Sequence, residues 1–197
     1  MNRIMSELDG KIVRYFKESA ELLAEFGETQ TTLIRRTAGE MIRALENGAR
    51  LLICGNGGSA ADSQHFAAEL VGRFLRDRRP LPAIALSTDT SILTSVANDY
   101  SFDDVFSRQV EALGTLNDVL VVLSTSGNSP NIINAVNTAK SKQLLTIALL
   151  GKGGGKVAGL VDLALVVPSQ RSQCIQQIHI AVIHMWCELI EDVLFPK

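Results

Sequence analysis

Residues 54–74 constrain the fold most, because they join a short apolar strand to a glycine-rich turn and then to a helix. The expected strand covers residues 51–54. The turn at residues 55–59 lets the backbone approach a ligand without hindrance from Cβ atoms. Ser59 is a candidate N-cap, and the N-terminus of the helix behind it attracts anions. This stretch therefore predicts a turn that holds an anion at the start of a helix.

The helix of this stretch carries two faces of different character. Its ionisable residues lie three, four and four positions apart and so share one face: Asp62, His65, Glu69 and Arg73. A separate apolar stripe can pack on a sheet and consists of Phe66, Leu70 and Phe74. The step from His65 to Glu69 can hold a metal ion, although a surface salt bridge or a partly buried histidine is the commoner outcome. A purely structural helix rarely needs both faces, so the ionisable face is a candidate site.

Residues 1–48 predict a pair of amphipathic helices, at about residues 6–26 and 31–47. Apolar residues recur at helical spacing in both segments, and Gly27 separates them. Two helices ahead of the first strand need an apolar surface to cover. They either pack on their own domain or bundle with helices of neighbouring copies, and the sequence leaves both alternatives open.

Residues 49–197 alternate short apolar strands with helices. Strands are expected at residues 51–54, 82–86, 118–123, 144–150 and 163–167. Besides the helix after the first turn, helices are expected within residues 87–99 and over 102–113, 131–142 and 172–194. This alternation predicts an α/β fold, a three-layer sandwich in which helices flank a five-stranded parallel sheet. The 197 residues, without an internal repeat or linker, predict a single domain.

A second motif, STSGNS at residues 124–129, follows the buried third strand. Its four hydroxyl groups surround a glycine and belong to Ser124, Thr125, Ser126 and Ser129. Hydroxyls and backbone N–H groups at a helix N-terminus can cradle a phosphate without a lysine. The alternative is a capped turn whose serines bond to the backbone. The number of hydroxyls favours the cradle, and both loops follow strands at the edge where parallel sheets bind ligands.

The last expected helix adds a second set of polar candidates. Gln176 and His184 lie near one another on a face distinct from its apolar stripe. If this face and the ionisable face of the first helix point to one pocket, Glu69 and His184 make a candidate acid–base pair. We expect His179, at the edge of the same face, to be structural rather than catalytic.

Asn98 and Asp99 form one further polar pair ahead of the helix expected at residues 102–113. Their side chains offer donors and acceptors to the hydroxyl groups of a ligand. The alternative is an ordinary helix C-terminus and turn, and the residues alone leave both open.

Composition excludes several classes of function. The chain has 19 Lys and Arg against 21 Asp and Glu, a net charge of −2, so it has no basic footprint for nucleic acid and no cationic surface for a membrane. No stretch is long and apolar enough to span a bilayer. Residues 55–59 lack the third glycine of a dinucleotide fingerprint and the Lys-Ser/Thr of a P-loop, which makes a nucleotide an unfavoured ligand.

The cysteines and the N-terminus indicate a compartment. Cys54, Cys174 and Cys187 are an odd number without paired spacing, so we expect reduced thiols in a cytoplasmic protein. Glu7 and Asp9 stand where a signal peptide would need an apolar run, and we expect no such peptide.

Together, the strand–GNGGS–helix segment, the STSGNS loop and the closing IQQIHIAVIH segment resemble the sugar-isomerase (SIS) domain family. Members of that family bind phosphorylated sugars. Within it, the chain resembles the phosphoheptose isomerases over essentially its whole length, with CGNGGSAADSQHFAAEL and ANDYSFDDVFSRQVEALG as further matching stretches. The resemblance implies isomerisation of D-sedoheptulose 7-phosphate to D-glycero-D-manno-heptose 7-phosphate through an enediol, in bacterial heptose and lipopolysaccharide synthesis. It also implies a homotetramer with the N-terminal helices used for oligomerisation.

The resemblance further implies a set of site residues. Those expected to bind substrate are Asn56, Gly57, Gly58, Ser59, Glu69, Asn98, Asp99, Ser124, Thr125, Ser126, Ser129 and Gln176. One zinc ion per subunit is expected on His65, Glu69, Gln176 and His184, although glutamine is an unusual zinc ligand. Glu69 is expected to take a proton from carbon 1, His184 to move protons on the oxygens, and Asp99 to assist.

A protein of the same family without isomerase activity is the competing hypothesis. One such relative binds the DnaA replication initiator as a tetramer, and the C-terminal Leu194-Phe195-Pro196 resembles it. That relative looks to have lost the residues matching Glu69 and His184, whereas this chain has both. The sequence therefore favours the isomerase. A sugar-phosphate-sensing regulator is a third possibility, but the length leaves no room for a DNA-binding domain.

Overall fold

The computed structural model describes residues 2–196, and the side chains from residue 5 on. Its centre is one sheet of five parallel strands in the order β2-β1-β3-β4-β5. The strands are β1 (Leu51–Gly55), β2 (Ala83–Ala85), β3 (Val119–Ser124), β4 (Leu145–Leu150) and β5 (Leu163–Val166). The helices are α1 (Asn2–Glu46), α2 (Gly58–Val71), α3 (Thr90–Asp99), α4 (Ser107–Leu113), α5 (Pro130–Ser141) and α6 (Ser172–Leu194), with 3-10 turns at Phe102–Asp104 and Val157–Gly159. The predicted α/β sandwich is confirmed.

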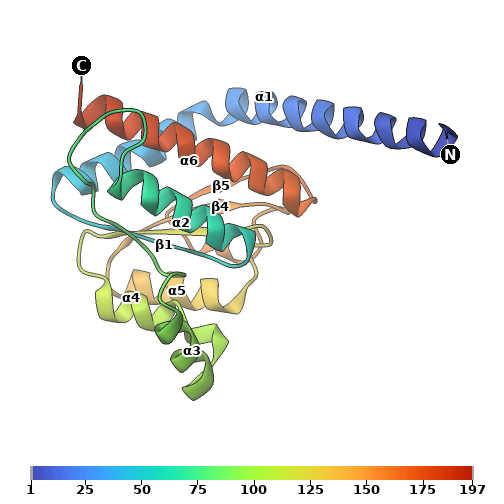
Figure 1. Cartoon of the computed structure of the whole chain (residues 1–197). Coiled ribbons are helices and arrows are strands. Elements are labelled where there is room, and N and C mark those ends of the chain that lie inside the picture. Colours follow the sequence, from blue (N-terminus) through green and yellow to red (C-terminus); the bar gives the residue numbers. More distant parts are fainter. Residues whose placement is uncertain (1, 197) are drawn as a thin grey trace.

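Helices cover the two faces of the sheet in separate groups (Figure 1). On one face, α1, α2 and α6 bury large side chains such as Met41, Phe66 and Trp186 against alternate strand residues. On the other face, α3, α4 and α5 pack over the intervening strand residues, through side chains such as Val110 of α4 and Ile132 of α5. Every residue of β1 and β3 is buried, as expected for parallel strands covered on both sides.

The predicted pair of N-terminal helices is wrong, because α1 is one continuous helix of 45 residues. Gly27 lies inside it with nothing within 4 Å of the position of a Cβ atom. A glycine inside a helix costs only about 1 kcal/mol relative to alanine, and no proline follows to end the helix. The hydroxyls of Thr29 and Thr31 donate to the carbonyls of Glu25 and Gly27, so they bond along the helix.

The two halves of α1 have different surroundings. Its C-terminal half packs on the domain through buried residues such as Ile34, Ala38 and Met41. Its N-terminal half extends beyond the three layers (Figure 1), and Ile12 and Phe16 there are 56% and 67% exposed. Packing on the chain's own domain thus accounts for the second half, whereas in the first half Tyr15 and Glu18 contact α6 and its N-cap residue Arg171 but Ile12 and Phe16 are left exposed.

Two local predictions also need correction. The helix predicted over residues 102–113 is a 3-10 turn followed by the shorter α4, since Ser101 caps the turn by accepting from the N–H of Asp103. Ser59 is not an N-cap: α2 begins at Gly58 after Gly57, and no side chain caps it. The carbonyl of Ser59 instead accepts a hydrogen bond from Ser63 Oγ inside the first turns of the helix.

The cysteines and the long helices bear on two further expectations. The three cysteines are buried and free, and burial raises the pKa of Cys187 to about 12. None of the helices within residues 2–196 combines the length and the apolar character needed to cross a bilayer.

Candidate active site

The strand order places the two ligand-like loops side by side. From β1 the chain proceeds to β2 at one edge, whereas β3, β4 and β5 follow in the opposite direction. The gap beyond the carboxyl ends of β1 and β3 is therefore the topological switch point, where open α/β sheets bind ligands. The glycine turn follows β1 and the STSGNS loop follows β3, so both predicted motifs meet there.

A small polar cavity lies at this point. Its volume is about 70 Å³, and it is lined by Asn56, Ser59, Leu123, Ser124, Thr125, Ser126, Ser129 and Gln176. Seven of these residues were sequence candidates, and Leu123 was not. The cavity thus brings together residues from β1–α2, β3–α5 and the start of α6, and hydroxyl and amide groups dominate its wall.

Backbone hydrogen bonds shape the STSGNS loop. Ser124 Oγ accepts from the N–H of Gly127 at 3.0 Å, and Ser126 Oγ accepts from the N–H of Asn128 at 3.2 Å. These are the bonds of the capped turn that the sequence left as the alternative. A hydroxyl that accepts still has its own proton to donate, so the same serines can bond an anion in the cavity.

The glycine-rich segment after β4 supports the STSGNS loop from behind. A Cβ atom on Gly127 would lie 1.9 Å from the carbonyl oxygen of Gly154, and one on Gly155 would lie 2.4 Å from that of Ser126. Both glycines also have positive φ, 61° and 56°. Asn128 Oδ1 accepts from the N–H of Lys156 at 3.1 Å. The two segments therefore pack backbone to backbone, which only glycine permits.

The glycine turn is held from two sides. The side-chain amides of Asn56 and Asn131, the latter in the first turn of α5, form two mutual hydrogen bonds. The Gln176 amide lies so close to Gly58 that a Cβ atom there would be 2.4 Å from Gln176 Nε2. Gly57 has φ of 56°, and both Gly57 and Gly58 are exposed. The predicted approach of backbone to ligand is therefore open on the solvent side.

A second cluster joins α2 to α6. His65 Nε2 lies 3.0 Å from His184 Nε2 and 3.3 Å from Glu69 Oε1. The two imidazole rings have centroids 5.2 Å apart. Glu69 and His184 are half-buried, and His65 is exposed. The ionisable face of α2 and the polar face of α6 therefore meet at His65 and His184. The pairing of Glu69 with His184 as acid and base stays a prediction.

The donors of this cluster fit zinc by their chemistry. Two imidazoles and a carboxylate are ordinary zinc ligands, and two nitrogens on one tetrahedral zinc ion lie about 3.3 Å apart. The 3.0 Å between the histidine nitrogens is close to that value. Within the described part of the chain, however, no group of three or more His, Cys, Asp or Glu side chains is arranged as a metal site. Zinc, with Gln176 among its ligands, remains a prediction.

Asp62 and His179 are two further ionisable residues on α2 and α6, and their surroundings differ. Burial raises the pKa of the Asp62 carboxyl, the nearby His65 opposes this, and the Oδ2 atom is buried without a hydrogen-bond partner. His179 is fully buried, with Nε2 3.2 Å from the carbonyl oxygen of Leu150. Burial lowers its pKa to about 4, which keeps the ring neutral at physiological pH. This fits the structural role predicted for His179.

Asn98 and Asp99 are placed apart from both groups. They lie at the C-terminal end of α3, where Asn98 Nδ2 donates to Asp99 Oδ1 at 2.8 Å. Both side chains are exposed, and neither lines the cavity. Their roles in binding and in assisting catalysis therefore remain predictions.

Two residues at the site were not found by sequence reasoning. Asn131 pairs with Asn56, and the ring of Phe74 stacks on that of His184, with centroids 5.6 Å apart and planes at 24°. Asn131 was assigned to a helix start and Phe74 to an apolar stripe. No local pattern signals either contact, because each joins segments more than 70 positions apart.

Comparison with known proteins places the chain among sugar-phosphate enzymes. The SIS domain profile matches residues 14–151. A phosphoheptose isomerase of Aquifex aeolicus is 50% identical over 187 residues, which cover 95% of this chain and 98% of the relative. The structure of a phosphoheptose isomerase from Neisseria gonorrhoeae superposes with a TM-score of 0.90 at 46% identity, covering 94% of this chain and all of the other. One from Francisella tularensis gives 0.91 at 40% identity, covering 94% and 98%.

Proposed function

This chain belongs to the phosphoheptose isomerases of the SIS domain family, and on that premise we propose how its residues carry out the reaction. The enzyme isomerises a ketose to an aldose, D-sedoheptulose 7-phosphate to D-glycero-D-manno-heptose 7-phosphate. The relatives reported above are named isomerases, so the DnaA-binding alternative is not favoured. The observation that carries the assignment of roles is the meeting of His65, Glu69 and His184. These residues lie on α2 and α6, the two helices that also supply Ser59 and Gln176 to the hydroxyl-lined cavity.

The substrate phosphate is assigned to the STSGNS loop. Hydroxyls of Ser124, Thr125, Ser126 and Ser129 line the cavity, which stands at the N-terminus of α5. The helix N-terminus favours a negative charge there. The sugar would extend across the turn at Asn56, Gly57 and Gly58 toward α2 and α6. The phosphate is remote from the reacting carbons, so its binding energy serves to orient the sugar.

The proton transfers are assigned to Glu69 and His184. Glu69 takes a proton from carbon 1 of the ketose and returns one to carbon 2 of the enediol. His184 gives a proton to the carbonyl oxygen on carbon 2 and removes one from the hydroxyl on carbon 1. These four transfers leave both groups in their starting states. We keep Asp99 as an assisting residue.

We assign one zinc ion per subunit to His65, Glu69, Gln176 and His184. When bound, it would act as a Lewis acid that stabilises negative charge on the substrate oxygens. Two imidazoles and a carboxylate, with His65 in contact with both His184 and Glu69, support this choice of metal. His65, which has no assigned proton-transfer step, would serve to hold the ion and to keep His184 in place.

We also propose a cytoplasmic homotetramer that serves bacterial heptose and lipopolysaccharide synthesis. The exposed apolar residues in the first half of α1 support an assembly, because a single copy leaves them in water. Pockets would then be completed at subunit boundaries. Asn98 and Asp99, which are away from the cavity of their own chain, are candidates for such a contribution.

The test is turnover of sedoheptulose 7-phosphate by wild type, Glu69→Gln and a control, Glu111→Gln. Glu111 is a well exposed carboxylate on α4, at 68%. Loss of a proton carrier typically costs about 10²- to 10⁴-fold in kcat, and the control should retain wild-type turnover. Loss of activity with a chelator and its return with zinc would support the metal. No turnover by folded wild type under any metal condition would contradict the isomerase, and binding to the DnaA initiator would be measured next.

A further inference from the structure

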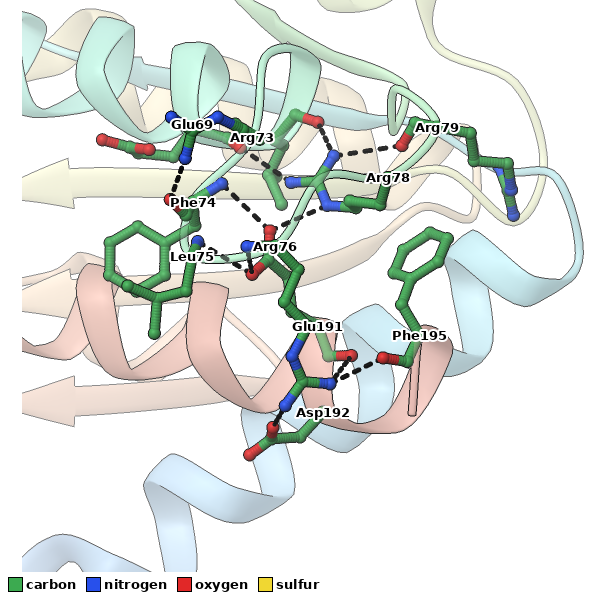
Figure 2. Close-up of polar contacts among 11 residues, drawn as sticks. Glu69, Arg73, Phe74, Leu75, Arg76, Arg78, Arg79, Glu191, Asp192 and Phe195 are labelled. Carbon is green, nitrogen blue, oxygen red and sulfur yellow. Dashed lines mark hydrogen bonds and ion pairs between the residues drawn. The ribbon is translucent and has the colours of Figure 1, made fainter. Parts of the chain in front are cut away.

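The Glu191 carboxylate, on the last turns of α6, holds the segment that follows α2. Its Oε1 atom accepts from the N–H of Phe74, and its Oε2 atom accepts from those of Leu75 and Arg76, each at 2.9 Å. Figure 2 shows these bonds converging on the one carboxylate. Burial would raise the pKa of Glu191, but the three N–H groups and Arg78 outweigh it and lower the pKa. The group is therefore a carboxylate at neutral pH.

Arg78 completes this arrangement and binds the C-terminal end of α2. Its Nε lies 2.9 Å from Glu191 Oε1, and both side chains are only 1% exposed. Its two terminal nitrogens donate to the backbone carbonyls of Glu69 and Leu70 at 2.8 Å each (Figure 2). Carbonyls in the last turn of a helix have no hydrogen-bond donors within the helix, so the guanidinium supplies the donors. The turn that carries Glu69 is thus tied to the cation that Glu191 neutralises.

The segment held by Glu191 reaches the other proposed proton carrier. Phe74, the first residue whose N–H Glu191 accepts, stacks its ring on the imidazole of His184. His184 and Glu191 lie seven positions apart on α6, two turns along one face. The imidazole is enclosed by the Phe74 ring at 5.6 Å and the His65 ring at 5.2 Å between centroids.

We propose that Phe74, Arg78 and Glu191 are positioning residues for the isomerase site. Through the Phe74 ring they set the orientation of the His184 imidazole, and through the end of α2 they set the place of Glu69. They act through those two groups and have no contact with substrate in this scheme. The proposal rests on the roles given to Glu69 and His184 above. A segment with only a structural task would need the ion pair but not an aromatic ring stacked on His184.

The first test compares Phe74→Leu with Phe74→Tyr. Leucine keeps the apolar character but removes the flat ring, whereas tyrosine keeps the ring. We expect kcat of Phe74→Leu to fall roughly 10- to 100-fold, the effect of a misplaced reacting group, with KM within about twofold of wild type. Phe74→Tyr should restore kcat. A Phe74→Leu enzyme with wild-type kcat would overturn the proposal while leaving the function intact, whereas an inactive wild type would overturn the function itself.

The second measurement reads the geometry without turnover. The chain has 3 histidines, so their ring C–H resonances can be assigned by NMR with His184→Gln as a reference. A stacked aromatic ring shifts the His184 resonances through its ring current. We expect that shift to disappear in Phe74→Leu and to persist in Phe74→Tyr. Unchanged His184 resonances in Phe74→Leu would contradict the stacking role.

The third test separates positioning from simple stability. Glu191→Gln removes the buried charge, and Asp192→Asn removes the neighbouring carboxylate, which is 48% exposed and pairs with Arg76. We expect Glu191→Gln, assayed while folded, to lose kcat as Phe74→Leu does, and Asp192→Asn to match wild type. If Glu191→Gln lowers only the melting temperature and keeps the kcat of Asp192→Asn, Glu191 is structural and the proposal fails.

Discussion

The side-chain amides of Asn56 and Asn131 bind each other through two hydrogen bonds, in which each Nδ2 donates to the opposite Oδ1 at 2.9 and 3.0 Å. The pair ties the glycine turn after β1 to the first turn of α5. Because both amides are occupied in this way, the turn at Gly57 and Gly58 keeps its position relative to the STSGNS loop. This amide pair therefore joins the two sides of the cavity, the turn between β1 and α2 and the loop between β3 and α5.

Asn131→Ala should weaken this connection. Removing the buried amide leaves Asn56 without its partner, so we expect the free energy of unfolding to fall by about 1–2 kcal/mol. The KM for the sugar phosphate should rise about tenfold with a smaller effect on kcat, since the turn binds rather than reacts. Asn134→Ala is the control, because Asn134 lies on the same helix and donates to the carbonyl of Asp103 away from the cavity. Equal KM values in the two variants would contradict this account.

Gly155→Ala should disturb the phosphate loop from behind. The new methyl group would lie 2.4 Å from the carbonyl oxygen of Ser126, so the loop must shift. We expect KM to rise at least about tenfold, because phosphate binding serves orientation. Gly153→Ala provides a matched control: Gly153 also has positive φ, 80°, but nothing lies within 4 Å of its Cβ position. A similar KM for both alanine variants would show that backbone strain, and not contact with the loop, is responsible.

His179→Gln should flatten the acid side of the stability profile. The folded pKa of about 4 lies below the ordinary value of 6.5, so below pH 6.5 the unfolded chain takes up a proton that the folded chain does not. Folding stability is therefore lost as pH falls from 6.5 toward 4, by up to about 1.4 kcal/mol per pH unit. Between pH 7.5 and 5, urea unfolding should show wild type losing about 2 kcal/mol more than the variant. Parallel profiles would mean that His179 is not kept neutral by burial.

Phe16→Glu should interfere with assembly. Phe16 is 67% exposed on the first half of α1, and a charge there is costly only if another copy covers it. We expect the variant to sediment as a smaller species than wild type, with unchanged helical content by circular dichroism. Val193→Glu is the control, since Val193 is 55% exposed near the end of α6. A Phe16→Glu protein with the wild-type sedimentation coefficient would exclude this surface from the interface.

Local patterns predicted much of the fold and of the site. Short apolar runs placed all five strands, and period-3.6 spacing placed the helix α6, to within a few residues. Glycine and hydroxyl residues after β1 and β3 identified the two loops that line the cavity. The N-terminal break at Gly27 was wrong, since a single glycine costs a helix only about 1 kcal/mol and no proline follows to end it.

The sequence by itself determined the α/β class, the two loops and the faces of α2 and α6, because backbone preferences and side-chain periodicity act over a few neighbouring residues. Tertiary structure decided which of these groups meet. His65 and His184 are 119 positions apart, and Asn56 and Asn131 are 75 apart. Such contacts depend on strand order and on the packing of α2 against α6 over one face of the sheet. Spacing along the chain can place residues on a common face, but only packing brings the faces of two helices together.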